Sequence, residues 1–190
     1  MLAQSRINLL ENYFDQNKLD EAWNGIQSFR VEAKGDDFKR FRHQWESRLN
    51  YLAVQILLIR NDTAQANTII QENLKLVKDK LLKKRQGCFL RLAGELLVRR
   101  NEFENALNYL RESVHLLEDV GNPRQLWQAY ASLASTFHRA GKSSEEHEYW
   151  GRTADLINKT ADRLSDNELK SDFLNADPIK RILSNSSAKA

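Results

Sequence analysis

An internal repeat constrains this chain more than any other feature of its sequence. Its anchor positions, 44, 40 and 40 residues apart, are Ala22, Ala66, Ala106 and Glu146. Nine residues before the anchors stand the large apolar residues Tyr13, Leu57, Leu97 and Phe137. Four residues after them stand Ile26, Ile70, Leu110 and Trp150. A period of this length is typical of proteins in which stacked repeats share one continuous core.

Each copy of the repeat is predicted to form two amphipathic helices. Apolar residues recur at i, i+3, i+4 and i+7 on both sides of a short polar break. The 190 residues include only seven glycines and two prolines, too few turn-forming residues for an all-β chain. The predicted helix pairs span 3–33, 37–80, 83–119 and 123–163, followed by a short helix near 166–174 and a stub from 178. The sequence therefore predicts an all-α fold.

This repeat pattern also suggests a domain organisation. We expect a single repeat domain over residues 1–183 and a flexible tail over 184–190. The repeats would span 3–36, 37–82, 83–122 and 123–163, and residues 164–183 would cap the open face of the last one.

Short polar residues indicate where several helices begin. An acid or amide follows three residues after each of four of them, the spacing of a capping box. These four are Asp62, Asn101, Ser143 and Ser165. Pro123 after Asn122 and Pro178 after Asp177 are expected in first helical turns, where the missing N–H costs nothing.

The third and fourth copies resemble tetratricopeptide repeats, lengthened from the usual 34 residues to 40. In the third copy the likeness rests on Leu90, Ala93, Gly94, Leu97, Phe103, Ala106 and Leu110. In the fourth it rests on Tyr130, Leu133, Ala134, Phe137, Gly141 and Trp150. Arg6 and Asn50 stand where the family prefers a large aromatic residue, and Glu146 stands where it prefers Ala. The resemblance implies a right-handed α-α superhelix of about four helix pairs plus a C-terminal capping helix.

A longer segment of the chain carries a narrower resemblance. The run from Leu116 to Ile157 is similar to the long tetratricopeptide tails of large bacterial signalling proteins. Those proteins include multidomain nucleotide cyclases, kinases and ATPase-type transcriptional activators. The segment from Ser165 to Leu183 is similar to the closing part of such tails. This resemblance implies that the chain is the C-terminal part of a larger bacterial protein, and we expect it in the cytoplasm.

In this family the first helices of successive repeats line a concave groove that holds a partner. The groove positions predicted here are Arg48, Tyr51, Gln55, Arg91, Glu95, Arg99, Gln128, Ser135 and His138. Trp127 is added as a contact anchor, because exposed tryptophans are enriched in binding hot spots. The expected partner is a protein or peptide segment, with an acidic one suiting the basic centre, or another domain of the parent chain. An effector-sensing role is also consistent with this groove.

Two basic stretches, 39–48 and 75–100, support the alternative of a nucleic-acid-binding helical repeat. The stretch from Phe38 to Trp45 interleaves cations with aromatic residues, as a single-stranded nucleic acid would require. The same spacing suits an amphipathic helix whose aromatic residues enter the core. The net charge of +3 is modest, which favours a protein partner over nucleic acid.

Catalytic and metal-binding patterns are missing from the sequence. No phosphate-binding GxxxxGK or nucleophile GxSxG motif occurs, and the four histidines have no HExxH or i, i+4 spacing. Cys88, the single cysteine, is expected to be half-buried; a reactive thiol near Arg85 and Arg91 is the rival interpretation. The apolar run Leu52–Ile59 is too short to span a bilayer. We therefore expect a non-catalytic module without cofactor or metal; an enzyme, such as a helical phosphatase regulator, is a third interpretation that no motif supports.

Overall fold

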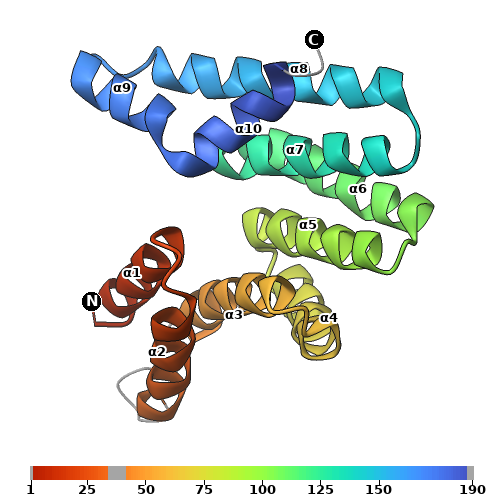
Figure 1. The fold of residues 1–190 in the computed structure, drawn as a ribbon. Helices are drawn as coiled ribbons and strands as arrows, with labels where there is room; N and C mark the ends of the chain where they lie inside the picture. The colour runs from red at the N-terminus through yellow and green to blue at the C-terminus, as the bar shows by residue number, and fades with distance from the viewer. Residues whose placement is uncertain (1, 34–41, 188–190) are drawn as a thin grey trace. The chain divides into compact units, whose positions relative to one another are not determined.

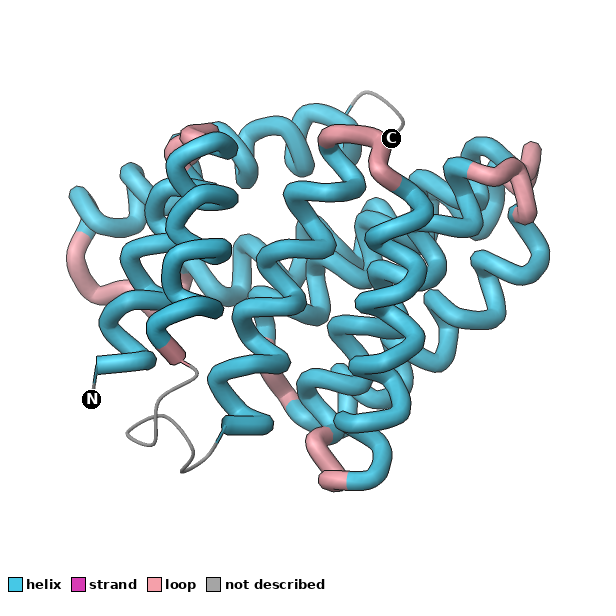
Figure 2. Tube along the Cα trace, turned by 90° about the horizontal axis from the view of Figure 1, so that it is seen from below, coloured by secondary structure: helices cyan, strands magenta, loops and turns pink. Residues whose placement is uncertain are grey.

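The computed structural model describes residues 2–33 and 42–187, and within these residues the chain forms ten α-helices and no strand. Short loops join the two helices of each pair (Figure 2). Four helix pairs are α1 (Leu2–Asp15) with α2 (Leu19–Glu32), α3 (Arg42–Ile59) with α4 (Thr63–Asp79), α5 (Lys83–Arg99) with α6 (Phe103–Val120), and α7 (Pro123–Arg139) with α8 (Ser143–Ala161) (Figure 1). The last two helices are α9 (Asn167–Asn175) and α10 (Asp177–Ser187). The prediction of an all-α chain of helix pairs is confirmed.

None of the helices in the described part of the chain combines the length and apolar character that crossing a bilayer requires.

The chain divides into two compact units, Met1–Leu92 and Ala93–Ala190, and the division falls within α5. The core of the first unit gathers where α1, α2 and α3 meet. Its largest members include Ile7, Ile26 and Leu52, all nearly inaccessible to solvent. Phe29 of α2 meets Trp45 of α3 edge to face, with ring centroids 5.3 Å apart. Trp45 thus lies against the core, as the amphipathic interpretation of its stretch requires, while residues 38–41 lie outside the described residues.

The core of the second unit ends in a cluster that the C-terminal helices complete. Trp127 of α7, Ile157 of α8 and Ile179 of α10 are buried together. Phe173 and Leu174 of α9 pack against this cluster. The short helix predicted near 166–174 corresponds to α9, and α10 continues to Ser187, past residue 183 where we ended the predicted cap. The division into one domain and a tail stays a prediction.

A left-handed residue closes the loop inside every helix pair. These residues are Asn17, Asn61, Asn101 and Gly141, with φ of 59°, 60°, 61° and 72°. Each stands five residues before an anchor of the repeat. In the second pair, the N–H of Asn61 donates to the carbonyl of Leu58 (3.2 Å) and the N–H of Asp62 donates to that of Leu57 (2.9 Å). This Schellman arrangement satisfies the last carbonyls of the first helix and turns the chain back.

The helix starts confirm some predicted caps and correct others. Asp62 accepts from the N–H of Gln65 at 3.1 Å, as predicted. Asn122, which was not among the predicted caps, accepts from the N–H of Gln125 at 3.1 Å. Asn101 is not a cap, because its left-handed backbone ends α5 and Glu102 precedes α6.

Two serines were also placed wrongly. Ser143 already lies inside α8, and Asp166 rather than Ser165 caps α9. An acid or amide three residues later did not show which of several neighbouring polar residues caps α8 or α9. Both prolines lie in first helical turns, as expected.

Leu81, in the loop between α4 and α5, is left-handed without being Gly or Asn. Its φ is 53° and its side chain is 85% exposed. We predict that Leu81→Gly raises the free energy of unfolding, because the left-handed penalty of about 1–2 kcal/mol exceeds the entropic cost of a glycine, about 0.4–1 kcal/mol. Urea denaturation measures the difference. Leu9→Gly, at an exposed helical position in α1, is the control and should lower stability by about 1 kcal/mol. Equal losses in both variants would contradict the strain at Leu81.

Gly94 allows the second half of α5 to approach α6 closely. A Cβ atom on Gly94 would lie 2.5 Å from Leu110 Cγ and 3.2 Å from the carbonyl oxygen of Ala106. Both distances are shorter than van der Waals contact. Gly94 and Ala106, two residues on which the tetratricopeptide likeness rests, thus lie where α5 and α6 pack together.

We predict that Gly94→Ala destabilises the protein by about 1–3 kcal/mol, the usual cost of overpacking a filled core. Gly151 of α8 is the matched control, because nothing lies within 4 Å of a Cβ added there. Gly151→Ala should stabilise the protein by up to about 1 kcal/mol, since alanine is the better helix former. Denaturant unfolding of the two variants measures both values, and a neutral Gly94→Ala would show that the close approach is wrong.

Candidate partner-binding surfaces

The predicted groove residues lie on first helices in both compact units. The group in the first unit is Arg48, Tyr51 and Gln55 on α3 and Arg91 on α5. The group in the second unit is Glu95 and Arg99 on α5 and Trp127, Gln128, Ser135 and His138 on α7. We call these the first-unit group and the second-unit group, and describe each by itself.

Arg48 in the first-unit group is held by α1. Its Nε donates to Glu11 Oε1 at 2.7 Å, and its Nη2 donates to Asn8 Oδ1 at 2.8 Å and also pairs with Glu11 Oε2. The Arg48 side chain is 16% exposed, so this ion pair is partly shielded from water. The guanidinium therefore links the first helices of the first two copies. Gln55, two turns further along α3, is half-buried.

Tyr51 and Arg91 are buried, which corrects the expectation that both occupy non-core positions. They are 7% and 6% exposed. Arg91 Nη2 donates to the Tyr51 hydroxyl at 2.5 Å, and its guanidinium lies 5.9 Å from the Tyr51 ring centroid. Phe89 meets the same ring edge to face at 6.1 Å. The pair forms a polar link between α3 and α5 inside the packed unit, and its role in partner contact stays a prediction.

Cys88 lies one turn before Arg91 and is completely buried rather than half-buried. Burial raises the pKa of its thiol, and this effect outweighs the nearby cations Arg91, Arg85 and Lys84, which lower it. The interpretation of Cys88 as a reactive thiol is therefore wrong. Within the described residues no group of three His, Cys, Asp or Glu side chains is placed to hold a metal ion.

Three members of the second-unit group are exposed, namely Arg99, Ser135 and His138. Glu95 is half-buried and accepts a hydrogen bond from the Ser132 hydroxyl at 2.7 Å, which links α5 to α7. Arg99 Nη1 donates to the carbonyl of Glu95 at 3.0 Å. The exposed side chains therefore lie on two first helices that the Ser132–Glu95 hydrogen bond links.

His138 of α7 contacts Glu146 of α8. Its Nδ1 lies 3.0 Å from Glu146 Oε2, and Glu146 is only 4% exposed. This explains how the repeat accepts an acid at the anchor position where the family prefers alanine. Gln128, on the same helix, is half-buried.

Trp127 is only 5% exposed, so the prediction that its side chain is exposed to a partner is wrong. Phe173 of α9 meets its ring edge to face, with centroids 5.9 Å apart. In the described part of the chain the pair α7–α8 is followed by α9 and α10, which cover its apolar surface as a capping segment would. Trp127 thus anchors the C-terminal helices.

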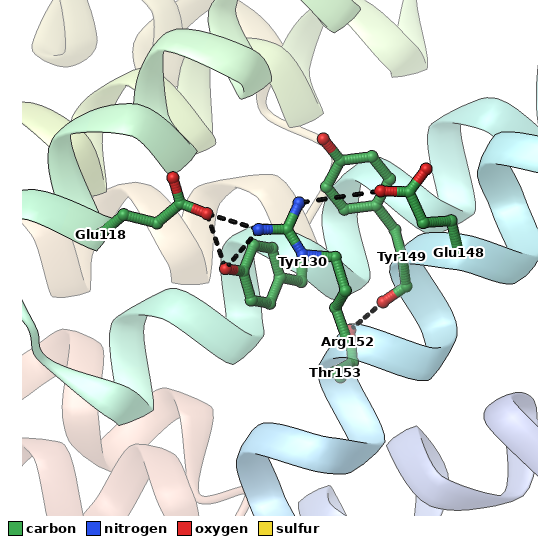
Figure 3. A network of polar contacts seen from close by, with 6 residues as sticks. All are labelled: Glu118, Tyr130, Glu148, Tyr149, Arg152 and Thr153. Atoms are coloured by element: carbon green, nitrogen blue, oxygen red, sulfur yellow. Dashed lines mark hydrogen bonds and ion pairs between the residues drawn. The ribbon is translucent and has the colours of Figure 1, made fainter.

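A network that the sequence analysis missed joins α6, α7 and α8 (Figure 3). The Tyr130 hydroxyl donates to Glu118 Oε1 at 2.7 Å, and Arg152 Nη2 donates to the same oxygen at 2.6 Å. The Arg152 guanidinium lies 4.5 Å from the Tyr130 ring centroid and 5.1 Å from that of Tyr149. Burial, followed by the hydrogen bond to Glu118, raises the pKa of Tyr130 to about 12. Glu118 and Arg152 stand 34 residues apart, and no sequence signal pairs them.

The Tyr130 network generates a pH-dependent prediction. Because the pKa of Tyr130 is raised on folding from 10.0 to about 12, its contribution to stability is complete below pH 10 and is lost as the pH rises toward 12. Tyr130→Phe should cost about 1 kcal/mol at neutral pH, and this difference from the wild type should shrink above pH 10. Urea unfolding across that range measures it. Tyr109→Phe, which removes a hydroxyl outside the network, controls for the substitution, and a pH-independent difference would contradict the role of Tyr130.

The two predicted basic stretches, 39–48 and 75–100, differ in how much of them the structure describes. Residues 39–41 of the first stretch lie outside the described residues, while Arg42 donates to the carbonyl of Ala33 at 3.3 Å. The second stretch carries exposed cations at the end of α4 and the start of α5, namely Lys75, Lys78, Lys80 and Lys83.

Comparison with solved structures identifies proteins with a similar fold. The sequence matches no family model and no curated protein. The structure is similar to the tetratricopeptide-like repeats of a Podosopora anserina putative kinesin light chain, with a TM-score of 0.61, 12% identity, and coverage of 98% of this chain and 93% of that one. It is also similar to Pseudomonas aeruginosa PilF, with a TM-score of 0.57, 13% identity, and coverage of 98% and 88%. The chain therefore has a tetratricopeptide-like helical repeat fold, as the resemblance implied.

Proposed function

We propose that the chain is a non-catalytic protein-interaction module, and that its partner contacts the exposed polar side chains of the first helices. The observation that carries this proposal is the exposure of Arg99, Ser135 and His138 on helices whose other faces are buried. A fold alone does not define a function, so the proposal rests on these side chains. The half-buried residues Gln55, Glu95 and Gln128 would complete the contact surfaces of the two groups.

The buried members of the two groups act indirectly in this proposal. Tyr51 and Arg91 hold α3 against α5, and Trp127 holds α9 and α10. Arg48 holds the start of α3 to α1. They position the exposed side chains without reaching the partner themselves.

The partner we propose is an acidic protein segment or an acidic face of another domain of the parent chain. Arg99 supplies an exposed positive charge, which would speed encounter with an acidic surface. We further propose that the chain is the C-terminal part of a larger cytoplasmic regulatory protein of bacteria. That part of the proposal rests on the sequence resemblance between Leu116 and Leu183.

Site-specific photocrosslinking in the native host tests this surface. A photoreactive residue replaces Ser135 on α7 in one variant and Glu112 on α6 in the control, both at exposed positions of the second unit. The Ser135 variant should crosslink to a protein that the Glu112 variant does not reach. Equal adducts from both helices, or nuclease-sensitive adducts alone, would contradict the proposal, and the second result would favour the nucleic-acid alternative.

Charge reversal tests the partner's acidity. Arg99→Glu should weaken the Ser135 crosslink by about tenfold, since it converts an attraction into a repulsion. Lys159→Glu on α8 makes the same charge change at an exposed second-helix position and is the control. Arg91 is unsuitable for this test, because a carboxylate in its buried position would disrupt the unit. An unchanged crosslink in Arg99→Glu would exclude an acidic partner at this surface.

A further inference from the structure

A cavity of about 420 Å³ lies in the first unit, and none of the residues that line it belongs to the second-unit group. It is lined by α1, the beginning of α3 and the first turn of α5. Its cationic side chains are Arg48, Lys83, Lys84 and Arg85, and its neutral polar ones include Gln44 and Ser47. Volumes of about 300–1,000 Å³ are typical of small-molecule sites.

Among the described residues, every charged side chain that lines this cavity is a cation. Four of the described residues that line it are Lys or Arg, and none is Asp or Glu. Arg48 pairs with Glu11 of α1, and two further cations of the lining, Lys84 and Arg85, lie in the first turn of α5. Lys84 and Arg85 are each half-buried, which weakens the screening of their charges by water.

The backbone of α5 adds to this positive field. Its first turn contains no acidic residue and consists of Lys83, Lys84, Arg85 and Gln86. Leu82, which directly precedes α5, has no side-chain oxygen that could accept a hydrogen bond from the first-turn N–H groups. Three cations at the positive end of a helix dipole repel it, and a bound anion would relieve that repulsion.

We propose that this cavity binds a phosphate monoester, in which one phosphate group is attached to a small polar group. Lys84 and Arg85 contact the phosphate, because charge-assisted hydrogen bonds to Lys and Arg are the strongest that a protein offers this dianion. Gln44 and Leu82 contact the organic part. The proposal goes beyond protein docking and does not depend on it, since the residues that carry it lie on different helix segments from Ser135 and Arg99.

Titration of the full chain with phosphoserine, followed by NMR of the backbone amides, tests this proposal. Saturable shifts are expected at Gln44, Lys84 and Arg85, with an affinity that falls as salt is added. Serine should cause no shifts, and inorganic phosphate should bind more weakly than phosphoserine. Equal affinities for phosphate and phosphoserine would overturn the proposal, because the organic group would then not be recognised. The absence of saturable shifts would overturn it as well.

Paired substitutions assign the phosphate contact to named residues. Lys84→Gln with Arg85→Gln should weaken phosphoserine binding by about tenfold or more, since two charged donors are lost. Lys78→Gln with Lys80→Gln removes the same charge from exposed positions outside the cavity and is the matched control. Equal weakening in both pairs would reduce the effect to net charge and overturn the site. Circular dichroism confirms that each variant is folded.

A derivative of phosphoserine distinguishes two sources of the phosphate monoester, a phosphorylated protein and a small metabolite. Phosphoserine with an acetylated amino group and an amidated carboxyl group imitates a phosphorylated side chain of a protein. Binding of the blocked and free forms with equal affinity would support a protein side chain as the source. Binding of the free form alone would support a small metabolite. The crosslinking from Ser135 is independent of all these measurements, so failure of this site and failure of the docking surface are distinguishable.

Discussion

The close approach of paired helices is the constraint on which the rest of the structure depends. In the third pair, the second half of α5 lies against α6 because Gly94 has no side chain and Leu110 fills the space where a Cβ would stand. The left-handed residue Asn101 then ends α5 and directs the chain into α6. A larger residue at Gly94 would separate the two helices, and the apolar residues at the repeated offsets would no longer meet. The small residue and the left-handed turn therefore act together, one setting the distance and the other the direction.

This packing decides which polar side chains remain available to a partner. A first helix buries one face, so residues of the same helix differ in exposure: Trp127 is covered by α9, while Ser135 and His138 are exposed. Polar groups that packing encloses form internal links, such as the Arg91 and Tyr51 pair and the Glu118, Tyr130 and Arg152 network. The candidate surface consists of what these links leave uncovered.

The helices could be predicted from the sequence because their determinants are local. Apolar spacing along a helix depends only on 3.6 residues per turn, and the cap at Asp62 depends on a side chain and an N–H three residues away. The prediction that Asn101 begins a helix was wrong, because an asparagine at a polar break can either begin a helix or end one. The repeated offset of Asn17, Asn61, Asn101 and Gly141 was the signal that distinguishes these roles.

The sequence by itself determined the all-α class, the helix pairs and the small residues at their contact, because each follows from periodicity or from the size of one side chain. Only the tertiary structure decided the burial of Tyr51, Arg91 and Trp127 and the lining of the basic cavity. Those features join residues that are far apart in the chain, such as Gln44 and Lys84, and their meeting depends on how the helices pack. No spacing within a single helix contains that information.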